Sequence, residues 1–106
     1  MRPTSVNILG KVHTITYVDK PSDVDIYHRQ SLLGQIDHWT HSIRVYDSGD
    51  NGEEILDTIL HEVLHGIVTA PHMCDDKMDD EDTISLLAMA LADTLIRNGW
   101  LKDENA

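Results

Sequence analysis

The sequence has one cysteine, no phenylalanine and few aromatic residues of any kind. Aromatic residues make up 5% of the 106 residues, so the core must be built mainly from Leu, Ile, Val, Ala and Met. The single Cys74 excludes a disulfide bond within the chain, which fits a reducing compartment. No apolar run approaches the length of a membrane span, and residues 1–10 lack the apolar segment of a signal peptide. We therefore expect a cytoplasmic protein.

Positive charge is also scarce. Eight Lys and Arg residues stand against 19 Asp and Glu residues, which gives a formal net charge of −11. Nucleic-acid binding needs a basic surface that displaces counterions, so we expect no nucleic-acid partner. An anionic membrane surface is disfavoured for the same reason. A basic peptide or protein partner is compatible with the charge but is not implied by it.

The rest of the composition is that of an ordinary globular protein, with 41% hydrophobic and 25% charged residues. The length fits a single domain, residues 1–106, with a modest core. Runs rich in β-branched residues dominate the first half, and helical periodicity dominates the second half. The sequence therefore predicts an α+β fold.

Short β-branched runs predict four strands, with a hairpin turn at Gly10 and a tight turn at Thr40 and His41. The predicted strands are Val6–Leu9, Val12–Val18, Leu33–Trp39 and Ser42–Tyr46. Residues 24–33 form either a short helix or an irregular connection. Two amphipathic helices follow, from about Glu53 to Thr69 and from about Asp80 to Arg97.

The first predicted helix carries His61 and His65 one turn apart, with Glu62 beside the first histidine. Residues four apart lie on one face of a helix, so the two imidazoles can share a tetrahedral zinc ion. Glu62 lies one step round the helix, where it can act as a general base on a water without being a ligand. The pattern predicts a zinc site, and a coincidence of spacing on an ordinary helix is the alternative.

The third zinc ligand is less determined by spacing. The candidates are His72, Asp75, Asp76, Asp79, Asp80, Glu81 and Asp82. A metzincin pattern fails, because Val68 and Pro71 occupy the positions of its Gly and third His. Glu81 and Asp80 both continue the inward face of the second helix, three and four residues before Ile84. Helix geometry leaves both open, and a solvated acid favoured by the helix dipole is the alternative for each.

The run His61-Glu62-Val63-Leu64-His65-Gly66, followed by an acid that opens a Leu- and Ala-rich helix, resembles the minimal gluzincin metallopeptidases. The ImmA/IrrE-like and SprT-like proteins belong to the same broad set. Small HExxH proteins encoded by phages and prophages are more similar still. The order of features is similar in those proteins and in this chain. Here it consists of a Gly-containing strand from Leu33-Gly34 onward, a strand at Ile43–Val45, the HExxH helix and a final helix that ends with Leu95–Asn98. The resemblance covers roughly residues 34–100.

This resemblance implies a small zincin-like domain, in which N-terminal antiparallel strands pack on the HExxH helix and a C-terminal helix. It implies Glu81 as the third zinc ligand and Glu62 as the general base of zinc-dependent peptide hydrolysis. The family's edge strand beside the site matches residues 33–46, so a peptide or protein substrate would pair near Ser42–Tyr46. For a phage-encoded member the location would be the host cytoplasm.

Several other residues have candidate supporting roles. Asp57, one turn before His61, can accept a hydrogen bond from an imidazole N–H, or it is a solvated acid of the helix. Trp39, Trp100 and the Met residues are expected to serve packing. Four residues are candidates to stabilise an oxyanion: His38, His41, Tyr46 and His72. For each of them, an ordinary surface or core role is the alternative.

Other functions are compatible with the same motif. A catalytically weak zincin-fold protein of phage origin, with a binding or regulatory role, would differ from a peptidase in turnover and not in zinc content. A structural zinc site usually has four ligands rich in Cys, and Cys74 stands alone. A catalytic thiol at Cys74 is disfavoured, because Asp75 and Asp76 would raise its pKa.

Overall fold

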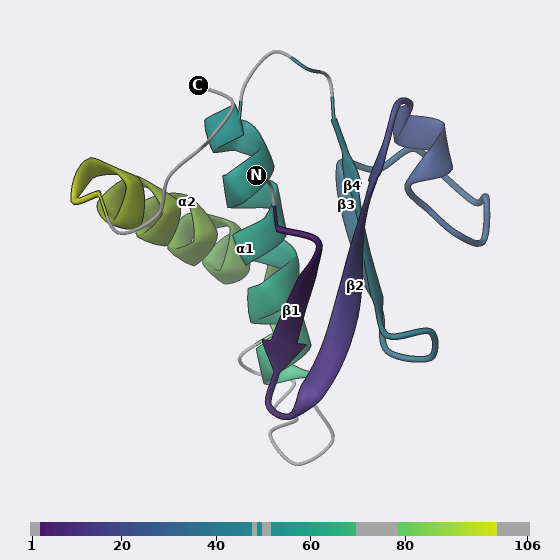
Figure 1. Ribbon diagram of the computed structural model, residues 1–106, viewed down its shortest axis with the longest axis horizontal. Coiled ribbons are helices and arrows are strands. Elements are labelled where there is room, and N and C mark those ends of the chain that lie inside the picture. Colours follow the sequence, from purple (N-terminus) through teal and green to yellow (C-terminus); the bar gives the residue numbers. More distant parts are fainter. Residues whose placement is uncertain (1–2, 48, 50–51, 70–78, 100–106) are drawn as a thin grey trace.

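The computed structural model describes residues 3–47, 49, 52–69 and 79–99. The elements are β1 (Ser5–Ile8), β2 (Lys11–Val18), the 3-10 turn η1 (Pro21–Asp23), β3 (Gly34–Asp37), β4 (Ser42–Tyr46), α1 (Gly52–Val68) and α2 (Glu81–Arg97). Helix α1 packs on one face of the sheet, and α2 packs on α1 (Figure 1). The predicted α+β class and the hairpin at Gly10 are confirmed. None of the described helices has the length and apolarity to cross a membrane.

The four strands form one sheet in the order β1-β2-β4-β3. Its two hairpins are antiparallel, but the central strands β2 and β4 are parallel, with Thr14 opposite Ser42 and Val18 opposite Tyr46. The prediction of antiparallel strands is therefore wrong for this pair. The parallel pairing follows from the path of residues 19–41. After β2 the chain first forms the edge strand β3 and then turns back, so that β4 fits between β2 and β3 and runs parallel to β2.

The turn between β3 and β4 is held by the carboxylate of Asp37. This side chain accepts hydrogen bonds from Trp39 N and from the Thr40 hydroxyl. His41 completes the turn with a left-handed φ of 50°. Trp39 lies in this turn and is 91% exposed, so the prediction that it serves packing is wrong.

The core lies between the sheet and α1. Its buried members are Ile8, Ile15, Ile43, Val45, Ile55, Leu56 and Ile59. Two glycines allow a close approach of the edge strand to this helix. A Cβ at Gly66 in α1 would lie 2.6 Å from Ile36 Cδ1, and a Cβ at Gly34 in β3 would lie 2.7 Å from Thr58 Cγ2. Strand β3 therefore lies directly against the helix that carries the predicted zinc ligands.

The connection between β2 and β3 covers part of the opposite face of the sheet, where Arg44 of β4 donates hydrogen bonds to its backbone carbonyls. The Asp25 side chain in this connection is fully buried. It accepts hydrogen bonds from Tyr27 N, Arg29 N, Arg29 Nε and Gln35 Nε2. Burial acts to raise the pKa of Asp25, but these hydrogen bonds outweigh it and hold the pKa well below its usual range. The ambiguous segment 24–33 is therefore an irregular connection organised by one carboxylate.

Candidate metal centre

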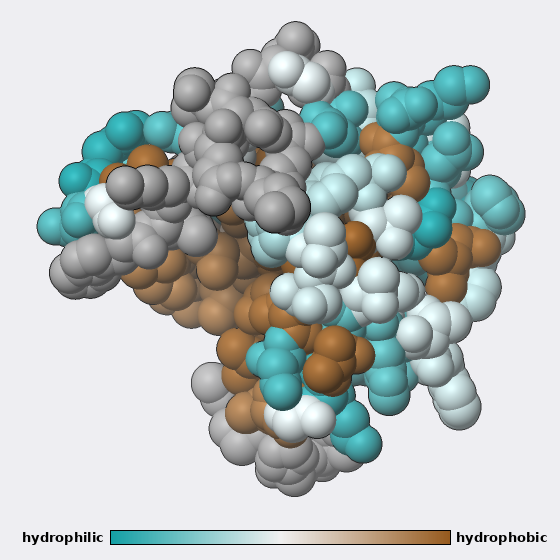
Figure 2. All heavy atoms as spheres, in the orientation of Figure 1, coloured by the Kyte–Doolittle hydropathy of each residue, from teal (hydrophilic) through white to brown (hydrophobic). Residues whose placement is uncertain are grey.

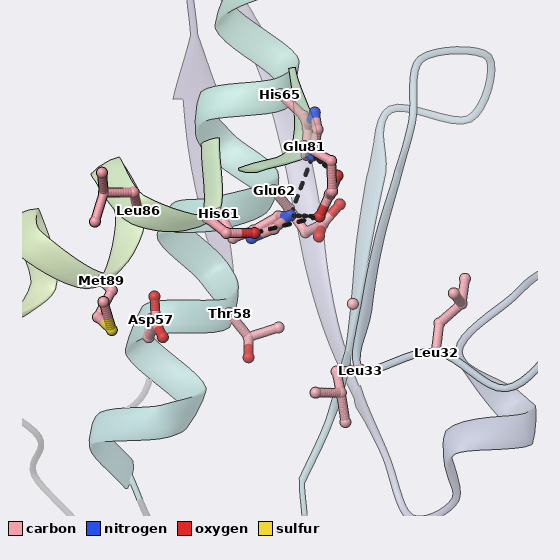
Figure 3. Close-up of a pocket in the computed structure, with 12 residues that line it drawn as sticks. Leu32, Leu33, Asp57, Thr58, His61, Glu62, His65, Glu81, Leu86 and Met89 are labelled. Atoms are coloured by element: carbon pink, nitrogen blue, oxygen red, sulfur yellow. Dashed lines mark hydrogen bonds and ion pairs between the residues drawn. The ribbon is translucent and has the colours of Figure 1, made fainter. Parts of the chain in front are cut away.

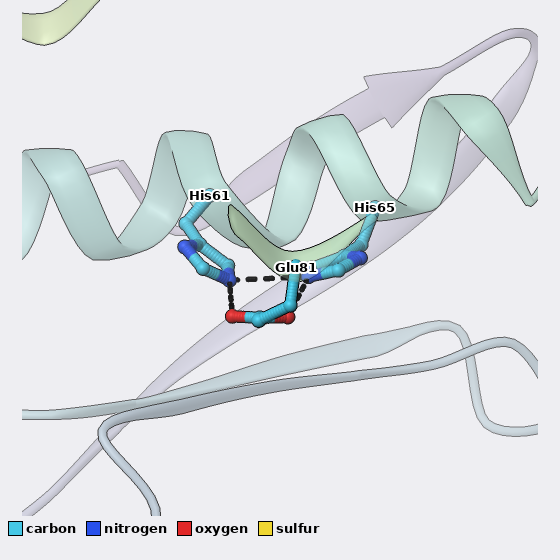
Figure 4. Close-up of side chains that lie close together, drawn as sticks. All are labelled: His61, His65 and Glu81. Carbon is cyan, nitrogen blue, oxygen red and sulfur yellow. Dashed lines mark hydrogen bonds and ion pairs between the residues drawn. The ribbon is translucent and has the colours of Figure 1, made fainter. Parts of the chain in front are cut away.

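His61 and His65 lie one turn apart on α1, and their rings meet the carboxylate of Glu81 from the first turn of α2 (Figure 4). The two Nε2 atoms are 3.1 Å apart. Glu81 Oε1 lies 2.9 Å from His61 Nε2, and Glu81 Oε2 lies 2.9 Å from His65 Nε2. Within the described residues, only this group brings three metal-ligand atoms of His, Cys, Asp or Glu within 4.8 Å of one another. Two imidazoles and a carboxylate are a known donor set for zinc, so these residues fit the ion that the motif implies.

The start of α2 decides which acid faces the histidines. Asp80 is the N-cap residue, and its side chain accepts hydrogen bonds from Thr83 N (3.0 Å) and Thr83 Oγ1 (2.7 Å). These bonds lower the pKa of Asp80 and commit its carboxylate to the helix end. Glu81 is therefore the acid that the structure brings to the histidines, and Asp82 does not join the group. The other candidates His72, Asp75 and Asp76 lie outside the described residues.

Asp79 contacts the His65 ring on the side away from Glu81. Its Oδ1 lies 2.7 Å from His65 Nδ1, so this nitrogen donates a hydrogen bond and Nε2 points toward Glu81. Such a bond fixes the tautomer and the orientation of a metal-binding histidine. Burial acts to lower the pKa of His65, but the hydrogen bond to Asp79 and the charges of Glu62 and Glu81 outweigh it, so the pKa is raised. Asp79 was one of the candidate ligands in the sequence, whereas the structure gives it this supporting position.

Glu62 lies beside the histidines and is only 8% exposed. Burial is the main cause that raises its pKa, and the charge of Glu81 adds to the effect. His61, His65 and a backbone hydrogen bond from Ile36 act in the opposite direction without cancelling it. A carboxylate with a raised pKa takes up a proton more readily, which is what a general base needs.

The histidines and Glu62 face a cavity of about 800 Å³ (Figure 3). Leu32, Leu33 and Gly34 line one side of it, and Leu86 and Met89 of α2 line the other. Leu33, Leu86 and Met89 are each more than half exposed. Figure 2 shows apolar surface gathered over α2, on the left of the molecule. The cavity therefore combines a polar floor with apolar walls.

The strand beside this cavity is β3 and not β4. Strand β4 lies between β2 and β3, so the prediction that a substrate meets the sheet edge at Ser42–Tyr46 is wrong. Tyr46 N donates a hydrogen bond to the carbonyl of Leu33. Hydrogen-bonded pairs alternate along an antiparallel ladder, so the backbone N–H and C=O groups of Gly34 and Ile36 point to the open edge.

Of the other candidate supporting residues that the structure describes, only Asp57 lines the cavity. His38 and His41 do not line the cavity, because the β3–β4 turn lies at the C-terminal end of α1, where His38 contacts Thr69. Tyr46, at the far end of β4 from this turn, does not line it either. Asp57 lines the cavity, and burial raises its pKa. Within the described residues it makes no hydrogen bond to His61, so the structure does not show the first of its two predicted roles, that of an acceptor for an imidazole N–H. The residues Cys74 and Trp100 lie outside the described part of the chain.

Sequence reasoning missed the apolar walls of the cavity, although one signal was present. Ser85 and Met89 follow Glu81 at intervals of four residues, so they share its face of the helix. For Leu33 and Gly34 only the family resemblance gave a signal, by matching residues 33–46 to an edge strand beside the site. Local spacing gave none, since their contact with α1 depends on the order of strands in the sheet.

Comparisons of the chain with protein-family models, curated proteins and solved structures found no match. The resemblance to gluzincin peptidases thus stays a prediction. The functional interpretation depends on the arrangement of His61, Glu62, His65 and Glu81 around the cavity.

Proposed function

We propose that the protein is a zinc-dependent peptidase of the zincin type, with His61, His65 and Glu81 as zinc ligands. The observation that carries the proposal is the convergence of three ligand atoms beside the buried Glu62, at the floor of an open cavity. A site with three protein ligands leaves a fourth position for a water molecule, which is typical of catalytic rather than structural zinc.

The proposed chemistry assigns the proton transfers to Glu62. A zinc ion held by the three ligands would lower the pKa of a water and polarise a peptide carbonyl. Glu62 accepts the proton of the attacking water at its carboxylate and returns it to the leaving amine. Its burial and raised pKa support this role, because they make the carboxylate a stronger base than an exposed one.

The substrate that suits this site is an extended peptide. The outward N–H and C=O groups of Gly34 and the outward C=O group of Ile36 in β3 would pair with such a chain, in the manner of an added strand. The N–H group of Ile36 is held by Glu62. Gly34 has no side chain to cover the strand next to the cavity. The exposed Leu33, Leu86 and Met89 would contact apolar side chains of the peptide.

Zinc content and peptide cleavage, measured on the same preparations, test the proposal. We expect the zinc-loaded protein to cleave a mixed peptide library, as read by mass spectrometry. The His61→Ala variant should lose one equivalent of zinc and the cleavage together, and Glu81→Gln should weaken both. His28→Asn is the matched control, because His28 is exposed and lies outside the site. Equal zinc and equal cleavage in the wild type and His61→Ala would contradict the proposal.

A further inference from the structure

A second group of three imidazoles lies near the C-terminal end of α1, outside the cavity. His13 comes from β2, and His38 and His41 come from the β3–β4 turn. The ring centroid of His13 lies 6.1 Å from that of His38 and 5.3 Å from that of His41. Zn–N bonds of about 2.0–2.1 Å place the centroids of two imidazoles on one tetrahedral ion roughly 5 Å apart. The group therefore has nearly the spacing of rings that share an ion.

The hydrogen bond of His13 determines which of its nitrogens is free. The ring is 2% exposed, and Nδ1 lies 3.0 Å from the carbonyl oxygen of Lys11. A carbonyl only accepts, so Nδ1 carries the proton, and Nε2 of the neutral ring is a bare lone pair. This buried Nε2 has no hydrogen-bond partner. An unpaired buried acceptor costs free energy, which a bound ion would recover.

The same reasoning assigns the proton of His38. The hydroxyl of Thr69 donates its one proton to the carbonyl of His65 at 2.6 Å. Its oxygen can therefore only accept from His38 Nε2, at 2.7 Å. The neutral His38 ring thus has its proton on Nε2 and a lone pair on Nδ1. In His13 and His38 alike, a protein oxygen holds one nitrogen and the other is available, as in metal-binding histidines.

We propose that His13, His38 and His41 form a second metal site, separate from the one at Glu81, for a divalent ion of the Zn²⁺ class. Neutral imidazole nitrogens suit Zn²⁺, Ni²⁺ and Cu²⁺, whereas Mg²⁺ and Ca²⁺ prefer oxygen ligands. In the metal-free arrangement the three nitrogens do not all lie within 4.8 Å. His38 and His41 are exposed. When an ion binds, we expect the ring of His41 to turn toward the buried Nε2 of His13, and His38 to offer Nδ1 while Thr69 keeps its Nε2.

Zinc binding by a protein that lacks the first site tests this inference. We expect His61→Ala to bind one Zn²⁺ per chain at micromolar concentration, in competition with a chromophoric chelator. Adding His38→Gln and His41→Asn should weaken this binding at least about tenfold. Asn suits position 41 because it tolerates the φ of 50° there. Adding His28→Asn instead, at another exposed histidine with positive φ, should leave the binding unchanged.

Two results would overturn the second site: no zinc on His61→Ala, or equal affinity with and without the changes at positions 38 and 41. NMR of the imidazole nitrogens gives an independent measurement. Without zinc, we expect His13 to carry its proton on Nδ1, and Zn²⁺ added to the His61→Ala protein should shift the His13 Nε2 resonance. An unshifted resonance in a zinc-loaded sample would also contradict the inference. Failure of the peptidase proposal would leave these results intact, because they are measured without the first site.

Discussion

Two buried carboxylates lie on opposite sides of the same sheet, Asp25 in the β2–β3 connection and Glu62 on α1. Asp25 accepts four hydrogen bonds, and its pKa is lowered. Glu62 has a backbone donor at Ile36 and the neighbouring imidazoles, and its pKa is raised. Burial alone therefore does not decide the role of an acid. The fully paired carboxylate organises a loop, whereas the underpaired one beside a cavity is available for chemistry.

The largest effect is expected from a substitution of Glu62, the carboxylate whose pKa is raised. Glu62→Gln keeps the shape of the side chain but removes the base, so kcat/KM for peptide cleavage should fall by about 10²–10⁴. The zinc content should stay at the wild-type level. The metal-free variant should unfold at no lower a temperature than the metal-free wild type, because burial of the charged carboxylate is unfavourable. Wild-type cleavage by this variant would remove Glu62 from the mechanism.

A smaller loss of peptide cleavage is expected when the Glu62 carboxylate is kept but moved from its position. In Gly34→Ala, the new Cβ would lie 2.7 Å from Thr58 Cγ2 and 3.1 Å from Glu62 Cγ. We expect cleavage to fall about 10–100-fold, since small displacements of a catalytic group are costly, with zinc binding retained. Adding Thr58→Ser removes the nearer methyl group and should restore part of the activity. No change in cleavage rate for Gly34→Ala would show that β3 does not position Glu62.

Asp79 is a paired acid like Asp25, but it lies beside the candidate metal centre. Asp79→Asn should weaken zinc binding about 10–100-fold, because the orientation of His65 depends on its hydrogen bond to Asp79. Chelator competition would measure the change. Asp82→Asn is the matched control, since Asp82 is an exposed acid in the first turn of α2 and is outside the ligand group. Equal losses in the two variants would point to a general effect of charge.

The smallest effect concerns stability and pH at Asp25. Because its folded pKa is lowered, Asp25 stabilises the fold above its unfolded pKa of about 3.9, and this contribution is lost as the pH falls toward the folded pKa. Asp25→Asn should therefore melt below the wild type at pH 7, with a difference that narrows as the pH falls below about 4. Cleavage per folded molecule should not change. Melting curves that differ equally at pH 7 and pH 3 would contradict this account.

Local spacing accounts for what the sequence predicted well. His61 and His65 are four residues apart on one helix. The periodicity of the second helix reduced the candidates for the third ligand on its inward face to Asp80 and Glu81. The identity of the edge strand was not predictable in this way, because it depends on how β4 inserts between β2 and β3. The meeting of His13 and His38 depends on the same strand order. Asp79 precedes the α2 N-cap, where no helical period applies.

The parallel pairing of β2 and β4 also bears on how the chain folds. It joins Thr14 to Ser42, 28 positions apart, whereas the turns of α1 join residues four apart. Distant pairings close slowly because of their loop entropy, and local helical turns form quickly. We therefore expect the two histidines of α1 to come together before β3 is placed against Glu62. If the proposed function holds, this folding order would give the chain the two imidazoles of its zinc site early, and the proposed peptidase activity only when folding is complete.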